Sequence, residues 1–174
     1  MLMPEAATCI CATLDDMAVV PMGGDGLDER FFATVESIRN HGGEQWWLHL
    51  ARCTACGQDW MIAQEERIYD DHFLKRLGRD QADAIVEEGK WPPDFLTYEA
   101  VLRIGQAHSN ACRFLDPRAD SLVWTVEELQ KARPGIDPGE IAELLGIPDA
   151  HAARLMRPER WHERIVRKLS TPRL

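Results

Sequence analysis

Two cysteines and a glycine form the stretch of this sequence with the clearest chemical potential. Two residues separate Cys53 from Cys56, which is followed by Gly57. The apolar run "EQWWLHLARC" ends at Cys53, and the run "QDWMIAQ" follows Gly57. Glycine adopts positive φ at little cost, so the chain can turn tightly and bring two sulfur atoms together. This spacing is typical of a metal knuckle, which supplies two of the four ligands of a tetrahedral zinc site.

A second pair of cysteines supplies the other half of such a site. Cys9 and Cys11 lie in "ATCICATL", and 41 residues separate Cys11 from Cys53. The CxC…CxxCG arrangement over residues 8 to 62 resembles a zinc ribbon, in which two knuckles from separate β-hairpins hold one zinc ion. It departs from the commoner pattern in the single residue within the first pair and in the long separation of the pairs. The resemblance implies a structural Zn²⁺ ion with four ligands, Cys9, Cys11, Cys53 and Cys56.

Other interpretations of these cysteines remain open. Cysteine is often buried as a small hydrophobe, so "TCICATL" also fits a core strand without metal. His41 and His49 offer imidazole nitrogens, which zinc accepts in place of a thiolate. A redox role fits less well, because the reactive pair of thioredoxin-like proteins opens a helix that lowers a thiol pKa. Here a strand pattern follows Cys56.

The ligand count also bears on catalysis. A catalytic zinc needs an open coordination position, so four thiolates would close the site and make it structural. Elsewhere the sequence has no GxSxG elbow, and "PMGGDG" lacks the lysine of a phosphate-binding loop. The sequence therefore predicts a protein that is not an enzyme.

Length and composition predict one folded protein without a membrane span. The chain has 174 residues, 45% of them hydrophobic and 28% charged. It contains no uninterrupted apolar run of about 18 residues, the length that a transmembrane helix needs. The N-terminal "MLMPEAATCICATLDD" lacks the basic segment and the cleavage site of a secretory signal. Five cysteines without such a signal indicate a reducing compartment, so a cytoplasmic location is expected.

Charge is distributed unevenly along the chain. Residues 1 to 149 carry 13 Lys and Arg against 27 Asp and Glu, a net charge of −14, and residues 150 to 174 carry seven against two, a net charge of +5. The two values sum to the −9 of the whole chain. An acidic body favours cationic partners, and a basic tail favours anionic ones. The body therefore predicts docking on a basic protein surface, with nucleic acid as the less favoured partner.

Hydrophobic periodicity predicts an α+β fold. Alternation in the runs before and after Cys53 and Cys56 indicates a β-hairpin connected by "TACG". Residues 28 to 39 fit a helix or a strand, and their Phe, Thr, Val and Ile content favours a strand that extends the hairpin. From residue 66 the spacing in "ERIYDDHFLKRL" and in later segments favours helices. We expect a zinc-stapled antiparallel β-hairpin or meander at residues 1–66, covered by an α-helical portion at residues 67–174, packed together as one domain.

The segment from residue 137 to 157 resembles a helix-turn-helix. Ala142 occupies the small position where the two helices meet, and Gly146 occupies the turn. In a DNA-binding protein the second helix reaches bases and phosphates, and here it offers Arg154 and Arg157. The resemblance implies an alternative function as a transcription regulator with a structural zinc site.

A tryptophan is the expected anchor for a protein partner. Trp46 and Trp47 fall on opposite faces of the predicted strand, and an exposed tryptophan is a common anchor, although burial of both is the alternative. We take Trp47, Arg154 and Arg157 as the candidate partner-binding residues. The acidic body and the structural zinc site then predict a zinc-stabilised protein-binding module without enzymatic activity. Such a module fits an acidic inhibitor or adaptor, such as an immunity protein that neutralises a basic toxin.

Overall fold

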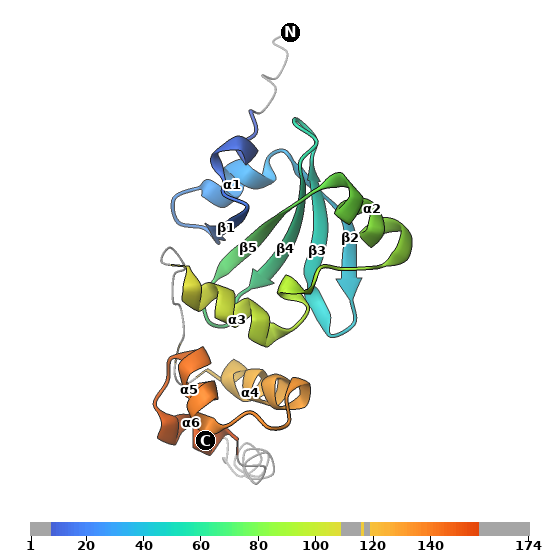
Figure 1. The fold of residues 1–174 in the computed structure, drawn as a ribbon. Helices are drawn as coiled ribbons and strands as arrows, with labels where there is room; N and C mark the ends of the chain where they lie inside the picture. The colour runs from blue at the N-terminus through green and yellow to red at the C-terminus, as the bar shows by residue number, and fades with distance from the viewer. Residues whose placement is uncertain (1–7, 109–115, 117–118, 157–174) are drawn as a thin grey trace, which may run out of the picture. The chain divides into compact units, whose positions relative to one another are not determined.

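The computed structural model describes residues 8–108, 116 and 119–156, and the chain divides into two compact units, residues 1–116 and 117–174. The first unit contains a five-stranded antiparallel sheet with several helices, and the second is helical over its described residues (Figure 1). The predicted α+β class is therefore confirmed. No helix within the described ranges is long and apolar enough to cross a membrane.

The sheet of the first unit has the strand order β1-β5-β4-β3-β2. Strands β2 to β5 follow one another as a meander, and β1 pairs with β5 at the edge. The predicted hairpin around Cys53 and Cys56 is confirmed, since Ala51 pairs with Trp60 across its two strands. The strands are β1 (Met17–Pro21), β2 (Val35–Gly42), β3 (Gln45–Cys53), β4 (Asp59–Glu65) and β5 (Asp71–Leu77).

Local capping residues determine where helices of the first unit begin and end. Helix α2 ends at Gly89, whose φ of 67° is accessible to glycine, and the Thr97 side chain accepts the backbone N–H of Ala100 to start α3. Helices α2 and α3 pack against β4 and β5, respectively (Figure 1). The segments are η1 (Cys11–Thr13), α1 (Leu27–Phe32), α2 (Arg79–Glu88), η2 (Pro93–Phe95) and α3 (Tyr98–Ala107).

Two predictions of secondary structure are wrong in part. The helix expected in "ERIYDDHFLKRL" is strand β5, in which the consecutive residues Phe73 and Leu74 are both fully buried. Because both faces of this part of the sheet are covered, the apolar residues do not alternate, and their spacing imitates a helix. The boundary expected at residue 66 therefore falls between two paired strands of one sheet. Residues 28–39, for which a strand was favoured, contain most of α1 and then the start of β2.

One hydrophobic cluster joins the sheet to the N-terminal segment. Trp60 of β4 is fully buried, and its ring meets Phe31 of α1 edge to face at 5.9 Å between centroids. The same cluster contains Cys11 and Cys53, which are 2% and 0% exposed. The first and second cysteine pairs are thus brought together by the burial of apolar side chains.

The second unit contains the two helices predicted between residues 137 and 156. Asp137 and Glu140 form a capping box at the start of the first, and Gly146 ends it with φ of 63°. Arg154 is exposed on the second, and Arg157 lies outside the described residues. The helices are α4 (Ser121–Ala132), α5 (Pro138–Leu145) and α6 (Asp149–Leu155).

Candidate metal centre

Four cysteine sulfur atoms gather at one place in the first unit. The Sγ atoms of Cys9, Cys11, Cys53 and Cys56 all lie within 4.8 Å of one another. A tetrahedral zinc site with Zn–S bonds of about 2.3 Å places its sulfur atoms about 3.8 Å apart. The cluster therefore matches the size and the soft donor set of a four-thiolate metal site, with all four predicted residues brought together.

The second pair is positioned by the turn between β3 and β4. Cys53 ends β3, its backbone N–H donates to the carbonyl of Gln58 at 2.9 Å, and its own carbonyl accepts the N–H of Gly57 at 2.8 Å. Gly57 has φ of 76°, which side-chain-bearing residues rarely adopt. This tight turn leaves Cys56 exposed while Cys53 is buried. The geometry is that expected of the CxxCG spacing.

The first pair is positioned differently. Cys11 opens the short helix η1, in which the backbone N–H of Thr13 donates to the carbonyl of Ile10 at 2.9 Å. The segment then leads into β1, an edge strand paired only with β5. The similarity to a zinc ribbon thus extends to the four cysteines and to one hairpin, whereas the first pair lies on a helical turn instead of a second hairpin.

The surroundings shift the pKa values of Cys53, Cys11 and Cys9. Burial raises the pKa of Cys53, but hydrogen bonds from the Thr34 hydroxyl and from two backbone amides of the turn outweigh it and lower the pKa to about 6. Burial raises the pKa of Cys11 to about 12, against an opposing hydrogen bond from Trp60. The backbone amide of Cys11 lowers the pKa of Cys9, but the neighbouring cysteines and burial raise it overall. The lowered pKa of Cys53 favours its thiolate, the form that metals bind.

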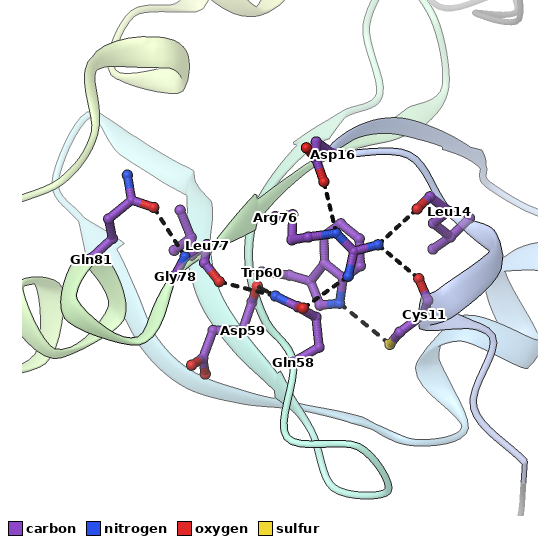
Figure 2. Close-up of polar contacts among 10 residues, drawn as sticks. All are labelled: Cys11, Leu14, Asp16, Gln58, Asp59, Trp60, Arg76, Leu77, Gly78 and Gln81. Atoms are coloured by element: carbon purple, nitrogen blue, oxygen red, sulfur yellow. Dashed lines mark hydrogen bonds and ion pairs between the residues drawn. The ribbon is translucent and has the colours of Figure 1, made fainter.

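Side chains outside the cluster hold the sulfur atoms. The indole N–H of Trp60 donates to Sγ of Cys11 at 3.4 Å (Figure 2), and Thr34 Oγ1 lies 3.4 Å from Sγ of Cys53. The Thr34 carbonyl accepts the backbone N–H of Thr54 at 2.7 Å, which ties it to the turn. Such outer contacts orient metal ligands and tune their charge. Nothing in the spacing of the sequence identifies Thr34 or Trp60, because their role depends on the folding of distant segments.

A buried carboxylate also fixes the turn between β3 and β4. Asp59, the first residue of β4, is 2% exposed and accepts a hydrogen bond from Nε of Arg52 at 2.6 Å. Nη1 of Arg79, at the start of α2, lies 3.3 Å from the second oxygen of Asp59. Two guanidinium groups thus compensate the charge of the buried carboxylate. They link the cysteine turn to both β3 and α2.

Two other predicted residues lie away from the cluster. His49 is on β3, where burial lowers its pKa to about 4, and the ring of His41 lies 5.1 Å from that of Trp91. Within the described residues, the only group of potential metal ligands is that of the four cysteines. Neither histidine therefore replaces a thiolate in this arrangement.

The prediction that Trp47 presents a binding surface is wrong. Trp47 is 3% exposed, and its ring packs edge to face against Tyr98 of α3 at 6.0 Å between centroids. The adjacent Trp46 is 59% exposed. The alternation along β3 correctly predicted that Trp46 and Trp47 lie on opposite faces. The packing of α3 decides which of the two side chains is covered.

The other end of β4 carries a second buried polar group, which no pattern in the sequence indicates. Glu65 is 1% exposed, and its carboxylate accepts the backbone N–H groups of Arg67, Ile68 and Tyr69 at 2.7–3.1 Å. The Tyr98 hydroxyl also donates to it. One side chain thereby satisfies the backbone of the turn between β4 and β5.

The cysteine cluster is suited to holding a metal ion. Four thiolates fill the tetrahedral coordination of zinc, which leaves no position for water or substrate. Such a site contributes to folding by fastening distant segments together. Comparison with known proteins finds no family model, no curated protein and no solved structure that matches this chain.

Proposed function

We propose that the protein is a binding module without enzymatic activity, whose fold is fastened by one structural zinc ion. The observation that carries this proposal is the approach of four sulfur atoms to within 4.8 Å of one another, from segments 41 residues apart in the chain. A reducing compartment keeps thiols available for metal and disfavours disulfides between them. Zinc is favoured among soft metals because four thiolates in a tetrahedron are its usual structural ligands.

The partner that we propose is a basic protein surface. Residues 1–149 have a net charge of −14, which attracts cationic surfaces and accelerates association with them. An acidic inhibitor of a cationic toxin, such as an immunity protein, has this charge relation to its target. The helix α2 supports the proposal, since Asp80, Asp83 and Glu87 are exposed along it beside Val86, which is 43% exposed.

Trp46 is the anchor that we propose for this partner. It is 59% exposed on β3, and aromatic side chains at the centre of an interface contribute much of its binding free energy. Gln45, beside it, donates to the carbonyl of Leu96 at 3.2 Å, so the strand end that carries Trp46 is fixed. A rigid anchor loses little conformational entropy on binding.

Affinity capture from the native host tests this function. Recovery of one basic protein, whose binding weakens with rising salt, is expected. The variant Trp46→Ala should weaken that binding at least about tenfold. Trp124→Ala is the matched control, because Trp124 is also 59% exposed but belongs to the second unit. Recovery of DNA alone, or equal effects of the two variants, would contradict the proposal.

A second candidate function is transcription regulation through the second unit. The supporting observation is the pair α5 and α6, in which Gly146 ends the first helix and the N–H of Ile147 donates to the carbonyl of Ala142 at 3.0 Å. This function predicts salt-sensitive binding to duplex DNA that Arg154→Ala and Arg157→Ala weaken. Arg103→Ala in the first unit is the charge-matched control. Equal binding by all three variants would exclude this candidate.

A further inference from the structure

Arg76 contacts the segment that carries the first cysteine pair. One nitrogen of its guanidinium, Nη2, donates to the carbonyls of Cys11 at 2.8 Å and Leu14 at 2.7 Å (Figure 2). Its Nε donates to Oδ1 of Asp16 at 3.0 Å, and its backbone N–H donates to the Asp16 carbonyl at 2.8 Å. The turn after Cys11 is therefore bound to the end of β5 along its whole length.

The same guanidinium reaches the segment that carries the second pair. Nη1 of Arg76 donates to Oε1 of Gln58 at 2.8 Å, and the amide of Gln58 donates to the carbonyl of Leu77 at 3.0 Å. The guanidinium carbon also lies 4.5 Å from the centre of the Trp60 ring (Figure 2). That ring presents its N–H to Sγ of Cys11 at 3.4 Å. Arg76 thus joins both halves of the metal centre through one planar group.

The chemistry of arginine explains why one side chain can do this. A guanidinium has five N–H donors in a fixed plane, and its face stacks on aromatic rings. Arg76 uses both properties, with its edge toward carbonyl and amide oxygens and its face toward Trp60. Its side chain is 26% exposed, so solvent screens its positive charge only in part where it donates to the Cys11 carbonyl. A lysine at this position would keep the positive charge but would lack the planar group that both donates to several oxygens and stacks on Trp60.

We infer that Arg76 is the positioning residue of the metal centre, holding Cys9 and Cys11 in place where a zinc ribbon uses a second hairpin. The first pair has only the single turn of η1 as local structure, and η1 has no side-chain cap. Its geometry therefore depends on long-range contacts, namely the apolar packing around Trp60 and hydrogen bonds donated by Arg76 and Trp60. Trp60 completes the arrangement, because the guanidinium packs on the ring that donates to Cys11. This inference rests on the proposed zinc site.

The test measures metal affinity and ligand geometry in the full chain. Zinc affinity is obtained by competition with a chromophoric chelator, and Co²⁺ absorption reports the thiolate geometry. Arg76→Lys is expected to weaken zinc binding about 10- to 100-fold and to change the cobalt spectrum. Arg103→Lys, whose guanidinium pairs with Glu99 within α3, is the matched control and should change affinity less than about fivefold. Equal affinity and spectrum for Arg76→Lys and the wild type would overturn the inference.

Cysteine alkylation separates a positioning role from general destabilisation. In the zinc-loaded Arg76→Lys protein, Cys9 and Cys11 should react faster than in the wild type, while Cys53 and Cys56 keep their rates. An equal increase at all four cysteines would contradict the inference. Trp60→Phe keeps the ring beneath the guanidinium and removes the N–H donor, so it should alter the cobalt spectrum with a smaller loss of affinity. A wild-type chain that binds neither metal would instead overturn the proposed function.

Discussion

The turn before β4 and the turn after it are held by different chemistry. Before β4, four thiols converge on one point, and the proposed metal ion completes the cluster. After β4, the carboxylate of Glu65 accepts three backbone N–H groups and the Tyr98 hydroxyl without any added component. With the proposed metal ion, the first turn depends on metal supply and thiol oxidation state, whereas the second depends only on the chain. This difference predicts that the two turns respond to different perturbations.

Removal of zinc should have the largest effect. A ligand that binds only the folded state stabilises it by about 4 kcal/mol when its free concentration is a thousandfold above its Kd. Chelation of the wild type, or Cys53→Ser, should lower the free energy of unfolding by about that amount, measured by urea denaturation under reducing conditions. Chelator should then have no further effect on Cys53→Ser. An unchanged wild-type midpoint would contradict a metal-dependent turn.

Glu65→Gln should have the next largest effect. The amide offers one acceptor oxygen in place of two and points an N–H₂ group at buried donors, which costs about 3 kcal/mol. Zinc content should stay unchanged, because the cysteine turn is at the other end of β4. Glu66→Gln is the matched control, since Glu66 is exposed. Loss of zinc from Glu65→Gln would show that the two turns are not independent.

The sheet between the turns should have its own acid sensitivity. Burial lowers the pKa of His49 from 6.5 to about 4, so between these values the unfolded chain binds more protons than the folded one. Stability is then present above pH 6.5 and falls as the pH decreases toward 4, by on the order of 2–3 kcal/mol. His49→Gln should flatten this part of a plot of unfolding free energy against pH. A variant with the wild-type slope would contradict the assignment.

Gly105→Ala should have the smallest effect and should act on the second turn alone. A Cβ atom at this position of α3 would lie 2.4 Å from Cε2 of Tyr69, whose ring is 3% exposed and cannot move freely. Overpacking costs about 1–3 kcal/mol, partly offset by the better helix propensity of alanine. Gly135→Ala is the control, because nothing lies within 4 Å of its Cβ position. Thermal denaturation of zinc-loaded protein measures the difference.

Patterns confined to short stretches of sequence predicted the structure well. The CxxCG turn, the hairpin around it and the paired helices that start at residue 137 depend on neighbouring residues, and the structure contains them. The α+β class followed from the same local patterns. Long-range burial produced the errors, since β5 is covered on both faces and α3 covers Trp47.

The residues that support the site could not be predicted from the spacing of the sequence, for the same reason. Arg76 and Trp60 are 65 and 49 residues from Cys11, the cysteine that they contact. Glu65 is an ordinary acidic residue in the sequence, and only the folded turn gathers three N–H groups around it. No local sequence pattern identifies side chains whose role is to join distant segments.

Metal content is the most direct test of the account. The protein is purified under reducing conditions without added metal, and zinc is determined by elemental analysis against protein concentration. A structural zinc site predicts about one zinc ion per chain, lost in Cys53→Ser and in Cys11→Ser. Less than about half an equivalent of zinc in folded, fully reduced wild-type protein would contradict a structural zinc site.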